Sequence, residues 1–194
     1  MKYIAINELA HFQFHDAEIE SIDFYDGCMM WKVGAVNATT ANTQSKFEKD
    51  MCIKSAQITF EDIQIESIIF NGYQVYDHNR NLIESKEPIT AKPSEYRGIL
   101  RETLEGFCYI FSMQELPVIE TNQYKVCFSI DGGAGMYDLT IGFSKSIVQW
   151  NEFDGEAWYE DEKWKKETKR TSTRSYGIAG SIFQKIKRSL RNKM

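Results

Sequence analysis

The sequence predicts a mainly β fold of the β-rich α+β type. We expect an antiparallel β-sandwich or curved barrel built from successive hairpins, with one short helix and a basic C-terminal helix or tail. One observation is that apolar and polar residues alternate with a period of two over much of the chain, as in strands that bury one face. Another is that Asn-Gly or Asp-Gly dipeptides lie between four pairs of such runs. Both residue types tolerate the positive φ that tight hairpin turns require.

The bulk composition is that of a folded domain. The chain has 194 residues, of which 42% are hydrophobic and three are proline, and this length can bury a core without disulfides or a structural metal. Its four cysteines, Cys28, Cys52, Cys108 and Cys127, form no C-x-x-C pair, so we expect reduced and mostly buried thiols. Neither a signal-peptide pattern nor a long apolar run is visible, which predicts a cytoplasmic protein.

The net charge of −5 conceals a division of charge along the chain. Residues 163–194 hold 11 of the 23 Lys and Arg but one of the 28 acids, which leaves +10 there and −15 on the rest. We therefore predict an antiparallel β domain over 1–164 and a basic tail over 165–194. In the tail, one side of an amphipathic helix carries Ile178, Ile182, Phe183, Ile186 and Leu190.

This charge division constrains the partners. An acidic body repels nucleic-acid phosphate and suits a cationic protein partner. The basic tail has three interpretations: docking on the acidic body, engaging a partner, or resting weakly on an anionic membrane. We favour the first two, because one short helix anchors weakly in a membrane.

The first long strand, over residues 12–25, shows two changes of parity. An apolar start at Tyr3 to Ile6 precedes it, followed by a helical turn that Asn7 caps. Its apolar residues then switch face twice, which predicts a kink or bulge near His15-Asp16 and another near Glu20-Ser21.

The later elements follow from turns and periodicity. We expect a strand over 51–60, long loops over 37–49 and 77–93, and a strand over 107–113. The only helix is expected after Pro93, with Ser94 as N-cap and Gly106 as terminator. The four hairpins are predicted at Asp26-Gly27 (17–25 with 28–36), Asn71-Gly72 (63–70 with 73–77), Asp131-Gly132 (a wider loop, 123–130 with 136–143) and Asp154-Gly155 (146–153 with 156–160).

His15, Asp16 and Glu18 are the candidate catalytic residues. A bulge can aim such side chains into a cleft as acid and base, which would make the protein a small hydrolase or metal-dependent enzyme. The alternative, which we favour, is a local turn in which Asp16 binds backbone amides. His11 and His15 would lie roughly 13 Å apart in a strand, at about 3.3 Å for each residue, which argues against one shared metal ion. We expect no metal or cofactor.

An aromatic and acidic cluster lies near the C-terminal end of the body. Its members are the partner-binding candidates Trp150, Phe153, Asp154, Trp158, Tyr159 and Glu160. Acids between aromatic residues are unsuited to nucleic acid but suit a protein with a basic face. The alternative is that the tryptophans form the edge of the core.

Two segments together carry a resemblance. They are the run Phe14-His-Asp-Ala-Glu-Ile-Glu-Ser-Ile22 and the later run from Val148 to Glu160. The pair resembles small uncharacterised bacterial β-rich families, some of which look like immunity proteins encoded beside polymorphic toxins. The resemblance implies no catalytic residues. It implies a non-enzymatic binding module, whose acidic surface would meet a cationic nuclease toxin.

Overall fold

The computed structural model describes residues 1–118 and 123–160. Contacts divide the chain into two units, Met1–Ala157 and Trp158–Met194. In the second unit the described residues are the 3₁₀ turn η3 (Trp158–Glu160). The predicted boundary at 164/165, the basic tail and its amphipathic helix lie outside the described residues.

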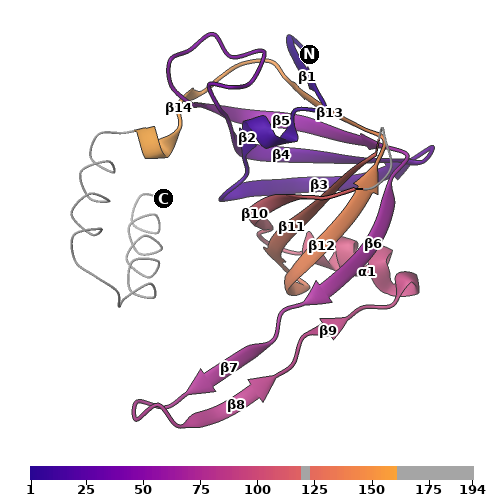
Figure 1. Cartoon of the computed structure of the whole chain (residues 1–194), viewed down its shortest axis with the longest axis vertical. Helices are drawn as coiled ribbons and strands as arrows, with labels where there is room; N and C mark the ends of the chain where they lie inside the picture. The colour runs from indigo at the N-terminus through magenta and orange to yellow at the C-terminus, as the bar shows by residue number, and fades with distance from the viewer. Residues whose placement is uncertain (119–122, 161–194) are drawn as a thin grey trace. The chain divides into compact units, whose positions relative to one another are not determined.

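The first unit is mainly β and antiparallel, with one short α-helix among its described residues, which confirms the predicted fold class (Figure 1). The helical elements are η1 (Leu9–His11), η2 (Pro93–Glu95) and α1 (Tyr96–Thr103). The strands are β1 (Tyr3–Ile6), β2 (Phe12–Gln13), β3 (Ala17–Tyr25), β4 (Cys28–Ala38), β5 (Met51–Glu61), β6 (Gln64–Phe70), β7 (Tyr73–Tyr76), β8 (Leu82–Lys86), β9 (Ile89–Thr90), β10 (Tyr109–Leu116), β11 (Tyr124–Gly132), β12 (Gly135–Phe143), β13 (Lys145–Trp150) and β14 (Gly155–Glu156).

One strongly bent sheet forms most of the unit. Its order is β1-β13-β5-β4-β3-β10-β11-β12-β6-β9, with β2 beside β4 and β14 beside β5. The end strands β1 and β9 do not pair with each other in the described part of the chain, so the sheet is not a closed barrel. The bend lies between β3 and β10, which are joined by two residue pairs, Tyr109 with Glu18 and Ile110 with Ala17.

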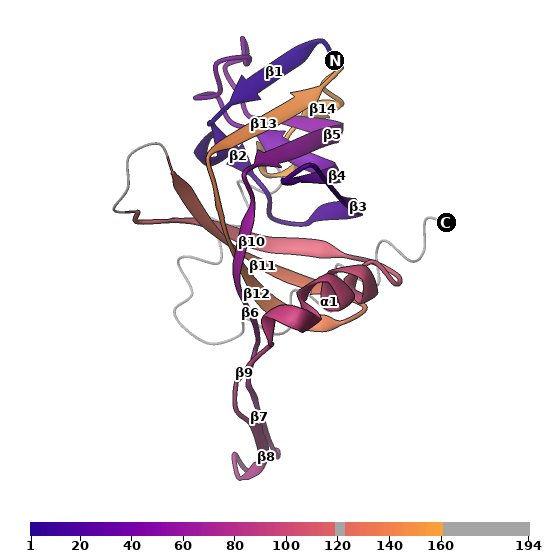
Figure 2. The ribbon, with the colours of Figure 1, turned by 90° about the vertical axis from the view of Figure 1, so that its right-hand side faces the viewer.

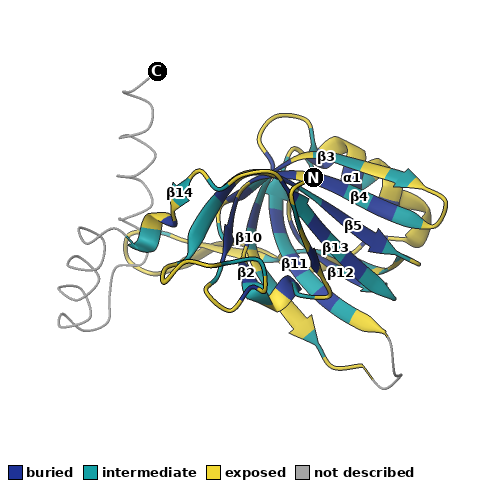
Figure 3. Cartoon of the chain, turned by 90° about the horizontal axis from the view of Figure 1, so that it is seen from above, coloured by how far each residue is buried: buried dark blue, intermediate teal, exposed yellow. Residues whose placement is uncertain are grey.

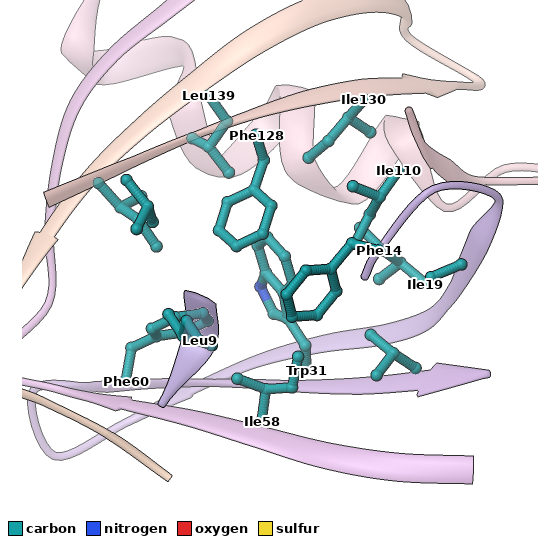
Figure 4. Close-up of a cluster of buried hydrophobic side chains, with 14 of the residues drawn as sticks. Leu9, Phe14, Ile19, Trp31, Ile58, Phe60, Ile110, Phe128, Ile130 and Leu139 are labelled. Atoms are coloured by element: carbon teal, nitrogen blue, oxygen red, sulfur yellow. The ribbon is translucent and has the colours of Figure 1, made fainter. Parts of the chain in front are cut away.

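The bend brings the two halves of the sheet face to face across the core (Figure 4). Trp31 of β4 is central, with its ring centroid 5.4 Å from that of Phe60 in β5 and 4.8 Å from that of Phe128 in β11. Phe14 meets the same Phe128 ring edge-on at 5.8 Å. Buried and partly exposed positions alternate along the strands, as the period of two predicts (Figure 3).

Helix α1 packs beside the half of the sheet that contains β11 and β12 (Figure 2), and one of its side chains also reaches β3 of the other half. The Thr103 hydroxyl lies 2.8 Å from the Tyr137 hydroxyl of β12, and the Arg97 guanidinium lies 4.6 Å from the centre of the Phe24 ring of β3. The predicted apolar face is confirmed, because Leu100 and Thr103 are buried. The predicted Ser94 N-cap is wrong: Ser94 lies inside η2.

Both predicted irregularities of this strand are confirmed, the first as a kink and the second as a bulge. Asp16 has a φ of 64° at the break between β2 and β3, and the pairing of β3 with β4 shifts register between Ile19 and Ser21. The Asp26-Gly27 hairpin is confirmed as well, since both residues have positive φ and Tyr25 pairs with Cys28.

Two other turns differ from their predictions. The Asp131-Gly132 hairpin exists, but its loop is tighter than predicted, because Gly132 still pairs with Gly135. The predicted Asn7 cap is wrong, since η1 starts after Glu8. The Asn7 side-chain oxygen instead accepts a hydrogen bond from the Ser146 amide at 2.9 Å.

The predicted hairpin at Asp154-Gly155 is wrong. β13 and β14 do not pair with each other, and both pair with β5. Trp150 pairs with Ala56 and Gly155 with Cys52. The chain therefore stops pairing with β5 after Trp150 and pairs with it again at Gly155, running in the same direction. Gly155 has a φ of 146°, a conformation that glycine adopts readily.

The predicted hairpin at Asn71-Gly72 and the predicted loop over 77–93 are also wrong. β6 pairs with β12 and β9, whereas β7 pairs with β8 in a separate two-stranded sheet. The chain therefore runs through Gly72 without reversing. A Cβ at Gly72 would lie 2.5 Å from the Lys86 backbone oxygen, so glycine is required there for close approach and not for a turn.

Candidate protein-binding surface

The break between β2 and β3 fixes His15 and Asp16 against β10. The Asp16 amide donates to the Ile110 backbone oxygen at 2.9 Å. His15 Nδ1 lies 2.8 Å from the Phe111 backbone oxygen, and because a carbonyl only accepts, Nδ1 donates the proton of that bond. Both residues therefore tie the corner to the neighbouring strand, as a structural turn does.

The His15–Asp16 pair lacks the geometry of an acid–base couple. His15 Nε2 lies 3.7 Å from Asp16 Oδ2, beyond hydrogen-bonding distance, and both side chains are about half exposed. A groove of about 410 Å³ lies beside His15, lined by residues of the β2 corner and of β10. Within residues 1–118 and 123–160, no group of three or more His, Cys, Asp or Glu could hold a metal ion. The structure thus brings His15 and Asp16 together beside a groove without aligning them for proton transfer.

Glu18 lies in a different setting, on the outer face of the sheet. It is the direct partner of Tyr109 across the β3–β10 joint, and Tyr109 is also the partner of Asp131 in β11. The phenol is therefore flanked by a carboxylate from each neighbouring strand. Partial burial, followed by the charges of Glu18 and Asp16, raises the pKa of Tyr109.

Phe107 adds a second aromatic ring beside this row. It is 71% exposed, the highest value among the large apolar side chains of the described residues. Its ring stacks on that of Tyr109, with centroids 6.1 Å apart and planes inclined by 15°. We call this set the acidic seam: Asp16, Glu18, Phe107, Tyr109 and Asp131. Ring faces and carboxylates are the groups that bind guanidinium and ammonium ions.

The sequence reasoning found Asp16 and Glu18 but missed Phe107, Tyr109 and Asp131 as site residues. The run over 107–113 is apolar at nearly every position, so its alternation does not say which face is buried. The structure buries Cys108 and Ile110 and turns Phe107 and Tyr109 outward. A bulge at Phe111 then changes the parity, so that Met113 packs against the core. The carboxylates beside Tyr109 come from the pairing of β10 with β3 and β11, for which the sequence offers no local signal.

The aromatic cluster near the end of the body is divided between core and surface. Trp150 is fully buried, with its ring centroid 5.3 Å from Tyr3 and 5.7 Å from Phe153. Its burial agrees with the core-edge interpretation. Phe153 is partly buried and Asp154 is exposed. Trp158, Tyr159 and Glu160 belong to the second unit, so a binding role for this cluster stays a prediction.

Comparisons of the chain with models of protein families, with curated proteins and with solved structures found no match. In residues 1–118 and 123–160, every helix is too short or too polar to cross a membrane.

Cys108, directly under the seam, predicts how stability responds to alkaline pH. All four cysteines are free, but only Cys108 is buried, whereas mostly buried thiols were predicted. Burial, followed by the charges of Asp131 and Glu18, raises the pKa of Cys108 to about 12. A raised folded-state pKa stabilises the fold below the unfolded-state pKa, and this contribution is lost as pH rises toward 12.

We therefore expect the free energy of unfolding to fall between about pH 9 and pH 12, with this thiol contributing up to about 1.4 kcal/mol for each pH unit. Urea unfolding at several alkaline pH values measures the slope. Cys108→Ala should make the free energy of unfolding fall less steeply with pH. Cys28→Ala, which removes a partly exposed thiol, should leave the slope unchanged. Equal slopes in the two variants would contradict the prediction.

Proposed function

We propose that the β unit is a non-enzymatic protein-binding module of the cytoplasm that receives a cationic segment of a partner protein on the acidic seam. The observation that carries this proposal is the exposure of Phe107, stacked on a tyrosine that two carboxylates flank. A partner that covers this ring removes its apolar surface from water, which favours binding. The proposal agrees with the resemblance to immunity-like proteins, whose partner would be a cationic toxin.

The charge of the unit supports a cationic partner. Residues 1–160 hold 12 Lys and Arg against 25 Asp and Glu. This excess gives a long-range attraction that accelerates encounter with a basic protein and weakens with salt. An arginine of the partner could then stack on Phe107 or Tyr109 while its guanidinium binds Glu18.

The groove beside His15 favours the alternative function, a small hydrolase or metal-dependent enzyme that uses His15 and Asp16. That function requires a free imidazole nitrogen and a second acid or base within hydrogen-bonding distance of it. The donation from His15 Nδ1 to the Phe111 oxygen orients the ring and leaves Nε2 as the acceptor. Asp16 Oδ2 lies 3.7 Å from Nε2, too far for the hydrogen bond that an acid–base pair needs. We therefore place binding before catalysis.

The test uses an arginine-rich peptide as probe and a citrulline-substituted peptide of the same length as its neutral control. We expect the arginine peptide to bind, with an on-rate that falls as salt is raised. Glu18→Lys should weaken binding at least tenfold, and Phe107→Ala by about tenfold, because a cation–π contact contributes roughly 0.5–2 kcal/mol. Surface plasmon resonance at two salt concentrations measures both effects.

Glu48→Lys is the matched control, since it makes the same change of charge at an exposed position in the loop between β4 and β5. It should reduce affinity only slightly. If Glu48→Lys and Glu18→Lys weaken binding equally, the attraction is diffuse and the seam is not the site.

A further inference from the structure

The β7–β8 hairpin is a projecting continuation of the main sheet. Ile69 pairs with Thr90 and Phe70 with Ile89 in the sheet, and Tyr73 pairs with Lys86 in the hairpin. These pairs share one unbroken register, so β6 with β9 and β7 with β8 form a single ribbon. It is interrupted at Pro88, which has no amide proton to donate. We call residues 71–88 the arm, and Figures 1 and 2 show it extending beyond the sheet.

The arm exposes apolar side chains without any core beneath them. Tyr73, Val75, Tyr76, Leu82 and Ile83 are between 40% and 66% exposed, and Ile83 is the most exposed of them. A two-stranded ribbon with no packed face is only marginally stable in water. Apolar exposure of this kind is typical of an interaction surface.

The tip of the arm is nevertheless well organised. Asp77 Oδ1 accepts hydrogen bonds from the amides of Asn79 and Asn81, both at 2.8 Å. The hydrogen bond from the Asn81 side chain, followed by the bonds from these two amides, lowers the pKa of Asp77. At the base, the Tyr73 hydroxyl donates to Glu84. The ribbon is thus held in shape by its own turn and side chains, so its apolar residues are presented on a defined surface.

The charge of the arm identifies the kind of partner that fits it. The arm carries three acids, Asp77, Glu84 and Glu87, and two basic residues, Arg80 and Lys86, which leaves −1. The remaining residues up to 160 hold 22 acids and 10 basic residues. A cationic protein is therefore drawn elsewhere on the unit. The β unit of a second copy carries the same excess of acids, so two such units repel each other least where their arms meet.

One face of the arm is also self-complementary. Val75 lies opposite Glu84 and Tyr73 opposite Lys86, so β7 supplies apolar groups and β8 supplies charges of both signs. In a two-fold contact, each residue meets its counterpart reciprocally, which lets Glu84 of one copy pair with Lys86 of the other. The arm has 18 residues, which is close to the number, about 20–30, that each partner contributes to a standard interface.

We propose that the arm is a dimerisation element, through which two copies of this chain associate about a two-fold axis. Val75, which lies on the same face as Glu84 and Lys86, contributes apolar contact, and Glu84 pairs with Lys86 of the other copy. This inference is independent of the proposed binding at the acidic seam.

The test is sedimentation of the full chain over a concentration series at constant salt. The wild type should form dimers, and Val75→Asp should raise the dissociation constant at least tenfold. Val118→Asp, which makes the same change at an equally exposed valine outside the arm, should still dimerise. Far-UV circular dichroism checks that both variants keep the sheet.

A charge exchange makes the test specific for a reciprocal contact. Glu84→Lys alone and Lys86→Glu alone should each remain monomeric at concentrations where the wild type dimerises, because like charges then meet. An equimolar mixture of the two variants should recover dimers. A monomeric wild type, open filaments, dimers insensitive to Val75→Asp, or a mixture that stays monomeric would each overturn the proposal.

Discussion

Trp31→Ala should lower the free energy of unfolding by about 4 kcal/mol, the range for removing a large buried aromatic side chain. Trp31 is fully buried, and its ring contacts Phe60 in its own half of the sheet and Phe128 in the facing half. Removing it leaves a cavity where the two halves meet, and neither half can collapse into the space without losing strand pairing. Urea unfolding monitored by circular dichroism measures the loss.

Two variants serve as controls for this prediction. Trp31→Phe keeps a ring at the centre and removes the indole N–H, which has no hydrogen-bond partner in the described residues. Trp31→Phe should therefore lower the free energy of unfolding clearly less than Trp31→Ala does. Phe107→Ala removes an aromatic ring from the surface and should change stability by less than about 0.5 kcal/mol. If Trp31→Ala lowers the free energy of unfolding no more than Phe107→Ala does, the two halves of the sheet do not depend on this contact.

Gly133→Ala should destabilise the protein by about 3 kcal/mol, at the upper end of the usual costs of overpacking. A Cβ at this position would overlap the backbone oxygen of Glu102 and lie 2.6 Å from that of Glu105. The Gly133 amide also donates to the Thr103 backbone oxygen at 3.0 Å, so the end of α1 is held against this turn. Because the crowded atoms belong to the backbone, the helix itself must move.

The matched control is Gly98→Ala, within α1 itself. No atom lies within 4 Å of a Cβ at Gly98, so alanine should stabilise the helix by roughly 0.5–1 kcal/mol. The same chemical change should thus have opposite signs at a glycine packed against the end of α1 and at an unpacked glycine inside it. Thermal unfolding of both variants checks this, and a neutral Gly133→Ala would contradict the described packing of α1.

The parts of the fold that follow from local chemistry could be predicted from the sequence. The Asp26-Gly27 turn, the kink at Asp16, the bulge at Glu20, and the buried face of α1 each depend on neighbouring residues alone. The arm could not be predicted in this way. Its strands have no buried face, so their residues do not alternate, and the actual reversal at Asp77 to Asn81 contains no glycine.

The candidate site was predicted only in part. Asp16 and Glu18 were selected for chemistry, whereas the structure uses the His15–Asp16 corner as a tie between strands and places Glu18 in an outward row. Tyr109 and Asp131 join that row because β10 pairs with both β3 and β11. This long-range pairing is not encoded in any local pattern, so a search for motifs could not find the seam.

The order of strands in the sheet also determines the time at which its edges close during synthesis. The open edge of β5 pairs with β13, which begins about 85 residues after β5 ends, and β6 pairs with β12, which begins about 65 residues after β6 ends. At roughly 5–20 residues per second, a nascent chain carries these open apolar edges for several seconds. We infer that the ribosome-bound intermediate, rather than the finished protein, is the form in which this chain most needs protection from aggregation.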